Sequence, residues 1–148
     1  MRYTPPVPDP VFDSLAPLAR GLGLFLVELT VSRHKGSVHI RAVVYRREGV
    51  SLNDCSAFHR AALPRLDLAF PGQNLYMEVS SPGIDRVIKD GYEFSFYPGH
   101  GIRCYRTDTS AWFSGILAGS DEKGIDLETG EGRARLPYGI IAKARLEA

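Results

Sequence analysis

The stretch from Leu75 to Arg86, LYMEVSSPGIDR, separates two parts of the chain that have different patterns. Apolar and polar residues alternate over its first six positions, which predicts a strand with one buried face and one exposed face. Pro82 and Gly83 then end the strand, because proline cannot donate the ladder hydrogen bond and the pair favours a type II turn. The residues before this corner mix helical and strand patterns, whereas the residues after it are strand-like. We therefore predict a domain boundary here.

The residues before the corner predict an α+β domain that spans 9–86. Asp9 can cap a first helix, and Pro10 suits the first helical position because its missing N–H would have no partner there. Ser51 can begin a second helix, with Asp54 placed for a capping box. Strand patterns lie between the two helices, at residues 24–32 and 38–47. The predicted order is therefore helix, strand, strand, helix, strand.

Prolines mark three further places in this half of the chain. Residues 1–8, MRYTPPVP, have no periodicity and are predicted to be a flexible lead-in. Pro17 and Pro64 fall inside helical patterns, where the ring removes one hydrogen bond and clashes with the preceding turn. We expect Pro17 to kink or shorten the first helix and Pro64 to end or bend the second.

The residues after the corner, 87–148, predict a small all-β domain. Tyr92, Phe94 and Phe96 alternate with polar residues, as in a strand with one buried face. Shorter strand patterns follow, separated by turn residues, at 102–106, 111–117, 125–127, 133–136 and 140–146. Several short strands at turn-limited spacing are typical of a small barrel.

Charge and cysteine usage restrict the class of protein. The chain has 18 Lys and Arg against 17 Asp and Glu, a formal net charge of +1. A tight nonspecific RNA-binding protein would be more basic, so any RNA contact should be local or shared with protein. Cys55 and Cys104 lie in different halves with no CxxC motif, which predicts free thiols and a cytoplasmic location. No apolar run approaches the roughly 20 residues of a membrane helix.

The chain has no recognisable catalytic or cofactor-binding motif. Cys55 and His59 are four residues apart and would share a helix face, but zinc would need two further ligands that the spacing does not supply. Gly21 and Gly23 precede a strand pattern instead of following one, so they do not form a dinucleotide fingerprint. We therefore expect no enzyme activity, no cofactor and no metal.

The motif VSSPGIDR, Val79 to Arg86, resembles the signature of the ribosome maturation factor RimP family. Val87 follows it where the family usually has proline, and Gly49 to Ala61 resembles the family's second helix. The resemblance implies an N-terminal α-β-β-α-β domain with a three-stranded sheet and a KH-like outline. It also implies a C-terminal SH3/Sm-like barrel. The chain has no GxxG loop, so the KH backbone clamp on RNA is not expected.

The same resemblance implies a function. RimP proteins are cytoplasmic factors that bind the free small (30S) ribosomal subunit and assist its late assembly. The implied partners are rRNA and a small-subunit ribosomal protein near the decoding centre, with the factor acting as a monomer away from membranes. The alternative is a stand-alone RNA-binding regulatory protein that uses an Sm-like barrel. An enzyme that uses Cys55 is the least favoured class.

Ten residues are candidates for contact with the ribosome or with RNA: Ser80, Ser81, Pro82, Gly83, Asp85, Arg86, Arg41, Tyr45, Arg47 and Trp112. The corner residues have two interpretations. They can be purely structural, with Arg86 holding the second domain, or Arg86 can grip an RNA phosphate with two hydrogen bonds. Arg41, Tyr45 and Arg47 share the outer face of the second strand, which is either a stacking surface or an ordinary solvated face. Trp112 either fills the barrel or stacks on a base.

Overall fold

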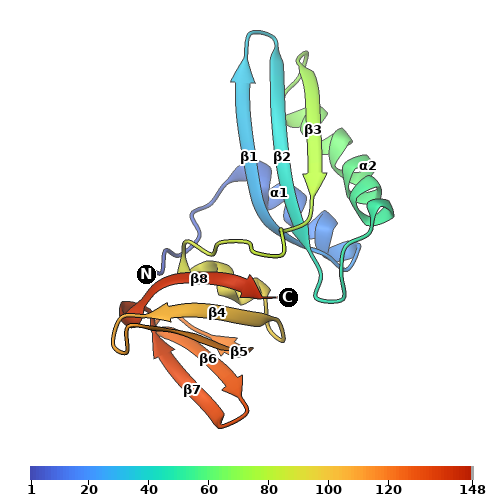
Figure 1. Ribbon diagram of the computed structural model, residues 1–148. Coiled ribbons are helices and arrows are strands. Elements are labelled where there is room, and N and C mark those ends of the chain that lie inside the picture. Colours follow the sequence, from blue (N-terminus) through green and yellow to red (C-terminus); the bar gives the residue numbers. More distant parts are fainter. Residues whose placement is uncertain (148) are drawn as a thin grey trace. The chain divides into compact units, whose positions relative to one another are not determined.

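The computed structural model describes residues 1–147 and contains two compact units (Figure 1). One unit is Val7–Pro82, and the other combines Met1–Pro6 with the chain from Gly83 onward. The fold is α+β, with a three-stranded sheet in the first unit and a separate five-stranded antiparallel sheet in the second. Within residues 1–147, no helix combines the length and the apolar character that crossing a membrane requires.

The Val7–Pro82 unit has the predicted order of elements. These are α1 (Pro10–Gly21), β1 (Phe25–His34), β2 (Ser37–Tyr45), α2 (Leu52–Ala69) and β3 (Asn74–Ser80). The sheet order is β1-β2-β3, with β1 and β2 antiparallel and β2 and β3 parallel. The parallel pair requires a crossover connection, which α2 supplies.

Local side-chain hydrogen bonds begin both helices as the sequence predicts. The Asp9 carboxylate accepts hydrogen bonds from the backbone N–H groups of Val11 and Phe12. At α2, Ser51 and Asp54 exchange side-chain and backbone hydrogen bonds in a capping box. These contacts satisfy N–H groups that have no partner within the helix, so each helix begins at its cap.

Pro64 was expected to end or bend α2, and it does not end the helix. Both Pro17 and Pro64 lie inside their helices, and α2 continues to Ala69. Phe58 and Leu66, on either side of Pro64, are fully buried in the core. Burial of the apolar stripe outweighs the lost backbone hydrogen bond, because tertiary packing supplies most of the stability of a helix in a protein.

The core of this unit lies between the sheet and the two helices, which Figure 1 shows on the same side of the sheet. Alternate residues of β2 are buried against Leu15 and Ala19 of α1 and against Phe58 of α2. These residues of β2 are Val38, Ile40, Ala42 and Val44. The intervening residues of β2 face the opposite side, so the sheet keeps one outer face.

The second unit is built from short strands and two short 3₁₀ helices. These are η1 (Gly91–Phe96), β4 (Gly101–Arg106), β5 (Ala111–Ser120), β6 (Gly124–Thr129), β7 (Gly132–Pro137), η2 (Tyr138–Ile140) and β8 (Ile141–Glu147). The sheet order is β7-β6-β5-β4-β8 and every pair is antiparallel. Its strands correspond to the five short patterns predicted after residue 101.

The predicted strand at Tyr92–Phe96 is wrong, because these residues form the 3₁₀ helix η1. The Asp90 carboxylate caps this helix by accepting a hydrogen bond from the Tyr92 N–H. Phe94 is fully buried, and its carbonyl accepts a hydrogen bond from the Tyr97 N–H. Three alternating aromatic residues form too short a run to distinguish a strand from one tight helical turn.

Residues Met1–Pro6 belong to the second unit. The Met1 amino group donates hydrogen bonds to the carbonyl oxygens of Tyr138, at 3.0 Å, and Ile141, at 2.9 Å. The Tyr3 ring stacks on the Tyr138 ring with a centroid distance of 5.9 Å. No local pattern in the first residues of the sequence indicates these partners, which are more than 130 positions away along the chain.

Candidate functional site

The corner that follows β3 differs in detail from the predicted turn. Gly83 does not have the positive φ that the third position of a type II turn requires. The turn instead spans Gly83 to Arg86, and the Arg86 N–H donates to the Gly83 carbonyl at 3.0 Å. The Leu146 N–H of β8 in turn donates to the Arg86 carbonyl at 3.0 Å. The turn therefore begins two residues later than predicted, and a hydrogen bond from β8 holds its last residue, Arg86.

Arg86 is bound to Glu93 by two short contacts. Its Nε lies 2.7 Å from Glu93 Oε2 and its Nη2 lies 3.0 Å from Glu93 Oε1. The Tyr97 hydroxyl also donates to Glu93 Oε2 at 2.7 Å. The two charged side chains are only 18% and 17% exposed. Because Nε and Nη2 of the guanidinium both donate to one carboxylate, these contacts favour the structural role for Arg86.

The other corner candidates are more accessible. Ser81, Gly83 and Asp85 are exposed, whereas Ser80 and Pro82 are half-buried. Ser80 ends β3, so its position is set by the sheet. The corner thus has exposed hydroxyl and carboxylate groups, whereas Arg86 is largely buried.

The outer face of the three-stranded sheet carries some of the predicted residues. Arg41 is exposed and lies 3.6 Å from Glu78 on β3. The prediction that Arg47 shares this face is wrong, because β2 ends at Tyr45 and Arg47 lies in the turn that follows, 3.6 Å from Glu48. Tyr45 is only 5% exposed, and burial raises the pKa of its hydroxyl. The neighbouring Val44 is buried too, so the alternation between exposed and buried residues stops at this end of β2. A β-bulge in the paired part of β1, which increases local twist, lies opposite this end.

Three aromatic rings that are not among the ten candidates also gather on this face. The His39 ring stacks on the Tyr76 ring with centroids 4.8 Å apart and an interplanar angle of 16°. The His34 ring meets His39 edge-on at 5.6 Å. Tyr76 is 55% exposed, and an exposed aromatic stack can accept a nucleobase. His39 and Tyr76 meet because β2 and β3 are parallel in this register, which no local sequence signal reveals.

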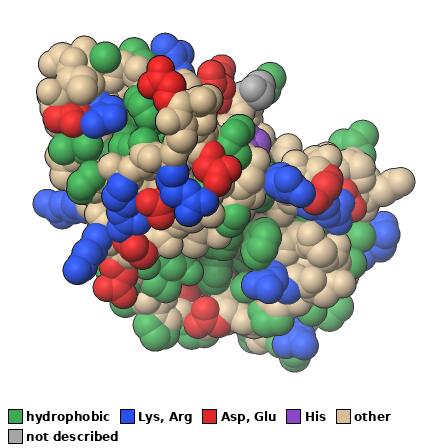
Figure 2. Space-filling model, turned by 90° about the horizontal axis from the view of Figure 1, so that it is seen from below, with side chains coloured by type: hydrophobic (Ala, Val, Ile, Leu, Met, Phe, Trp, Pro, Cys, Tyr) green, Lys and Arg blue, Asp and Glu red, His purple; other side chains and the backbone are tan. Residues whose placement is uncertain are grey.

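Trp112 lies on β5 and is 38% exposed. The Arg103 guanidinium carbon is 4.5 Å from the Trp112 ring centroid, and that of Arg145 is 5.7 Å away. The Tyr105 ring meets the indole edge-on at 5.5 Å. Trp112 is therefore a surface aromatic residue accompanied by two cations. Figure 2 shows one face of the molecule, on which Lys and Arg side chains are interspersed with Asp and Glu. This face therefore has no continuous basic patch.

Cys55 and His59 line an open hollow of about 350 Å³ together with Ser56, Arg60 and Val79. Burial and the nearby Asp54 carboxylate raise the pKa of the Cys55 thiol, which disfavours the reactive thiolate. Among residues 1–147, no group of three or more His, Cys, Asp or Glu side chains could hold a metal ion.

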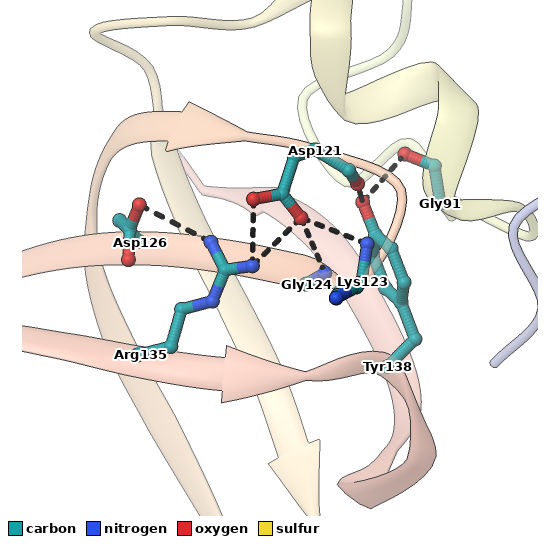
Figure 3. Close-up of polar contacts among 7 residues, drawn as sticks. All are labelled: Gly91, Asp121, Lys123, Gly124, Asp126, Arg135 and Tyr138. Carbon is teal, nitrogen blue, oxygen red and sulfur yellow. Dashed lines mark hydrogen bonds and ion pairs between the residues drawn. The ribbon is translucent and has the colours of Figure 1, made fainter.

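A cluster of polar contacts lies at the turn between β5 and β6 (Figure 3). Arg135 Nη2 lies 2.7 Å and 2.8 Å from the two carboxylate oxygens of Asp121, and Arg135 Nη1 lies 3.3 Å from Asp126. Asp121 also accepts hydrogen bonds from the backbone N–H groups of Lys123 and Gly124. These contacts, led by the Arg135 guanidinium, lower the pKa of Asp121 to about 2. Every partner of this carboxylate holds the turn, so the cluster is structural.

We expect the Asp121→Asn variant to lose a pH-dependent contribution to stability. The folded-state pKa of about 2 is below the value of about 3.9 for an unfolded chain. The contribution is therefore present above about pH 4 and is lost as the pH falls towards 2. Urea unfolding followed by fluorescence of the single tryptophan, Trp112, measures it in this unit. The gap between wild type and variant should close below about pH 2 to 3; a gap that is constant with pH would contradict the assignment.

Comparison with known families identifies the first unit. Residues 14–85 match the family model described as the RimP N-terminal domain. The matched span begins within α1 and ends immediately before Arg86, so it includes β1, β2, α2, β3 and most of the corner. The resemblance inferred from the sequence motif is confirmed.

Proposed function

We propose that this chain, whose residues 14–85 match the RimP N-terminal domain, binds the free small (30S) ribosomal subunit and assists its late assembly. The observation that carries this proposal is the family match over residues 14–85. Such a factor acts without covalent chemistry, by binding a precursor conformation more tightly than the finished particle. A difference in affinity of this kind shifts the population towards the bound conformation.

The architecture supports this role. Two compact units joined between Pro82 and Gly83 can each supply a binding surface, and joint engagement raises the overall affinity. In our proposal the first unit is a KH-like domain and the second is an SH3/Sm-like barrel. The strand order β7-β6-β5-β4-β8, with the single turn η2 before the last strand, supports the barrel.

The proposed partners are rRNA, a small-subunit ribosomal protein, or both, and the proposed location is the cytoplasm. We propose that the factor acts as a monomer and without enzyme activity. Contacts are proposed at the accessible corner residues and on the two exposed surfaces: Ser80, Ser81, Pro82, Gly83, Asp85, Arg41, Arg47 and Trp112. Arg86 and Tyr45 are proposed to have a structural role and not to contact the partner, because Arg86 is paired with Glu93 and Tyr45 is buried.

Sedimentation of a cell lysate tests this function. We expect the tagged protein to migrate with free small subunits and to be absent from translating ribosomes. We expect the Arg133→Ala variant to migrate as the wild type does, because the exposed arginine that it removes is paired with Glu128 and is not a proposed contact. Migration with small RNAs alone would favour the stand-alone regulatory protein. An equal distribution between free subunits and translating ribosomes would contradict a role in assembly.

A further inference from the structure

The strand register places five side chains on one face of the five-stranded sheet. Directly paired residues share a face, and so do residues two positions apart along a strand. Tyr105 of β4 pairs with Trp112 of β5 and with Lys143 of β8. Arg103 pairs with Arg145. We call this set the cationic-aromatic face: Arg103, Tyr105, Trp112, Lys143 and Arg145.

The opposite side of these strands is the core of the unit. It carries buried side chains from β4 and β8, which are Ile102, Cys104, Ala144 and Leu146. Because the pleat points alternate residues to opposite sides, the cationic-aromatic face is the outer surface of the sheet. Arg103, Trp112 and Lys143 are exposed, and Tyr105 and Arg145 are half-buried.

The cations of this face differ from the other arginines between Gly83 and Glu147. Arg103, Lys143 and Arg145 have no carboxylate partner among residues 1–147. The other arginines after Gly83 are each paired: Arg86 with Glu93, Arg106 with Asp108, Arg133 with Glu128, and Arg135 with Asp121 and Asp126. Charge that is not neutralised within the unit is therefore concentrated beside its only tryptophan.

A hollow of about 230 Å³ adjoins this face at β8. Its lining includes Lys143 and Arg145 from the face, together with Lys89 and the apolar side chains of Val87 and Ile88. The hollow extends the row of cations beyond the sheet edge and adds an apolar floor. A single-stranded nucleic acid matches this combination, because its phosphates are negatively charged and its bases are flat and largely apolar.

We propose that the cationic-aromatic face binds single-stranded RNA. A base stacks on the exposed part of the Trp112 ring, and Arg103, Lys143 and Arg145 contact the flanking phosphates. The two guanidinium groups that now lie near the indole can turn towards phosphate oxygens when a base takes their place, because neither is fixed by a carboxylate. This inference rests on the proposed function only in identifying the RNA as a single-stranded segment of the immature subunit.

The charge of the face favours RNA over a ribosomal protein as the occupant. A basic protein would place like charges opposite Arg103, Lys143 and Arg145, and such juxtaposition is costly. Glu147 is the acidic side chain on the same side of β8, two residues beyond Arg145, and it offers one carboxylate against three cations. A stacked base and phosphate contacts use the tryptophan and all three cations of the face.

Binding of a labelled single-stranded uridine oligonucleotide of about 12 nucleotides, a length within the range that small ssRNA-binding domains cover, tests the proposal. Fluorescence anisotropy gives the affinity, and quenching of Trp112 reports directly on stacking. We expect quenching at saturation and a loss of about 5-fold or more in affinity for Trp112→Ala. Arg103→Gln and Arg145→Gln should each weaken binding and reduce the slope of log K against log salt by about 0.7.

Arg133→Ala is the control, because it removes the same charge from an exposed, paired position of the same unit. Unfolding curves of each variant separate loss of fold from loss of binding, and the two glutamine variants leave the tryptophan in place. The proposal is overturned by RNA binding without quenching, by equal weakening in Arg133→Ala, or by no RNA binding. It is also overturned if a peptide from a ribosomal protein quenches Trp112 and the RNA does not.

The outcomes distinguish this proposal from the proposed function. Wild-type protein that migrates with free small subunits but does not bind the oligonucleotide would overturn the RNA-binding face alone. Protein that binds the oligonucleotide with quenching but never migrates with small subunits would overturn the proposed function alone.

Discussion

Replacing Arg86 with alanine is expected to lower the free energy of unfolding of the second unit by about 3 kcal/mol. The change removes both contacts to Glu93 and leaves that carboxylate, which is only 17% exposed, without its cation. An uncompensated charge in a poorly solvated position is costly, whereas the intact pair balances its own desolvation. Urea unfolding followed by Trp112 fluorescence measures the loss, because the tryptophan lies in the same unit.

Two variants make this expectation specific. Arg133→Ala breaks an ion pair whose side chains are 61% and 56% exposed, and its unfolding curve should stay close to that of the wild type. Arg86→Met combined with Glu93→Gln removes both charges and keeps an oxygen acceptor for the Tyr97 hydroxyl. We expect this double variant to recover part of the loss. If Arg86→Ala unfolded at the same urea concentration as the wild type, the pair with Glu93 would not be structural. Arg86 would then again be a candidate for contact with the partner.

Replacing Gly124 with alanine is expected to destabilise the same unit by about 2 to 3 kcal/mol. A Cβ atom at this position would meet the Leu136 carbonyl oxygen and would lie 3.0 Å from the Pro137 Cα. Both neighbours belong to the backbone of β7, so the strand has to move to accept a methyl group. The movement would disturb the pairing of β6 with β7 and the adjoining turn that Asp121 holds.

Gly119→Ala is the control for this steric argument. Gly119 lies on β5, and an added Cβ would meet nothing within 4 Å. We expect its unfolding midpoint in urea to stay close to that of the wild type, while the midpoint of Gly124→Ala falls. If both alanine variants were equally destabilised, the cause would be loss of glycine in a strand in general and not the close approach of β7.

These two predictions concern the frame that presents the proposed binding surfaces. Arg86 fixes the start of the second unit through Glu93, and its carbonyl is also bound by β8. The same strand carries Lys143 and Arg145 of the cationic-aromatic face. A loose corner would therefore change the position of two of the proposed RNA contacts, so binding assays on Arg86→Ala need to be made where the variant is fully folded.

Several features could be predicted from the sequence because they depend on neighbouring residues. Asp9 with Pro10, and Ser51 with Asp54, begin helices through hydrogen bonds that span two or three positions. The order of elements in the first unit follows from local periodicity, and the VSSPGIDR motif indicated the family that the match at residues 14–85 confirms. The same local logic failed at Tyr92–Phe96, where three alternating aromatic residues form a helical turn.

Other features were decided only by the tertiary structure. The stack of His39 on Tyr76 depends on the parallel register of β2 and β3, and the cationic-aromatic face depends on the registers of three strands. The partner of Arg86 is a glutamate seven residues later that a turn and a short helix bring back to it. By itself the sequence determined where most elements begin, in what order they follow in the first unit and which family residues 14–85 match. Side-chain neighbours across strands required the folded chain, because register is set by the packing of the whole core and not by adjacent residues.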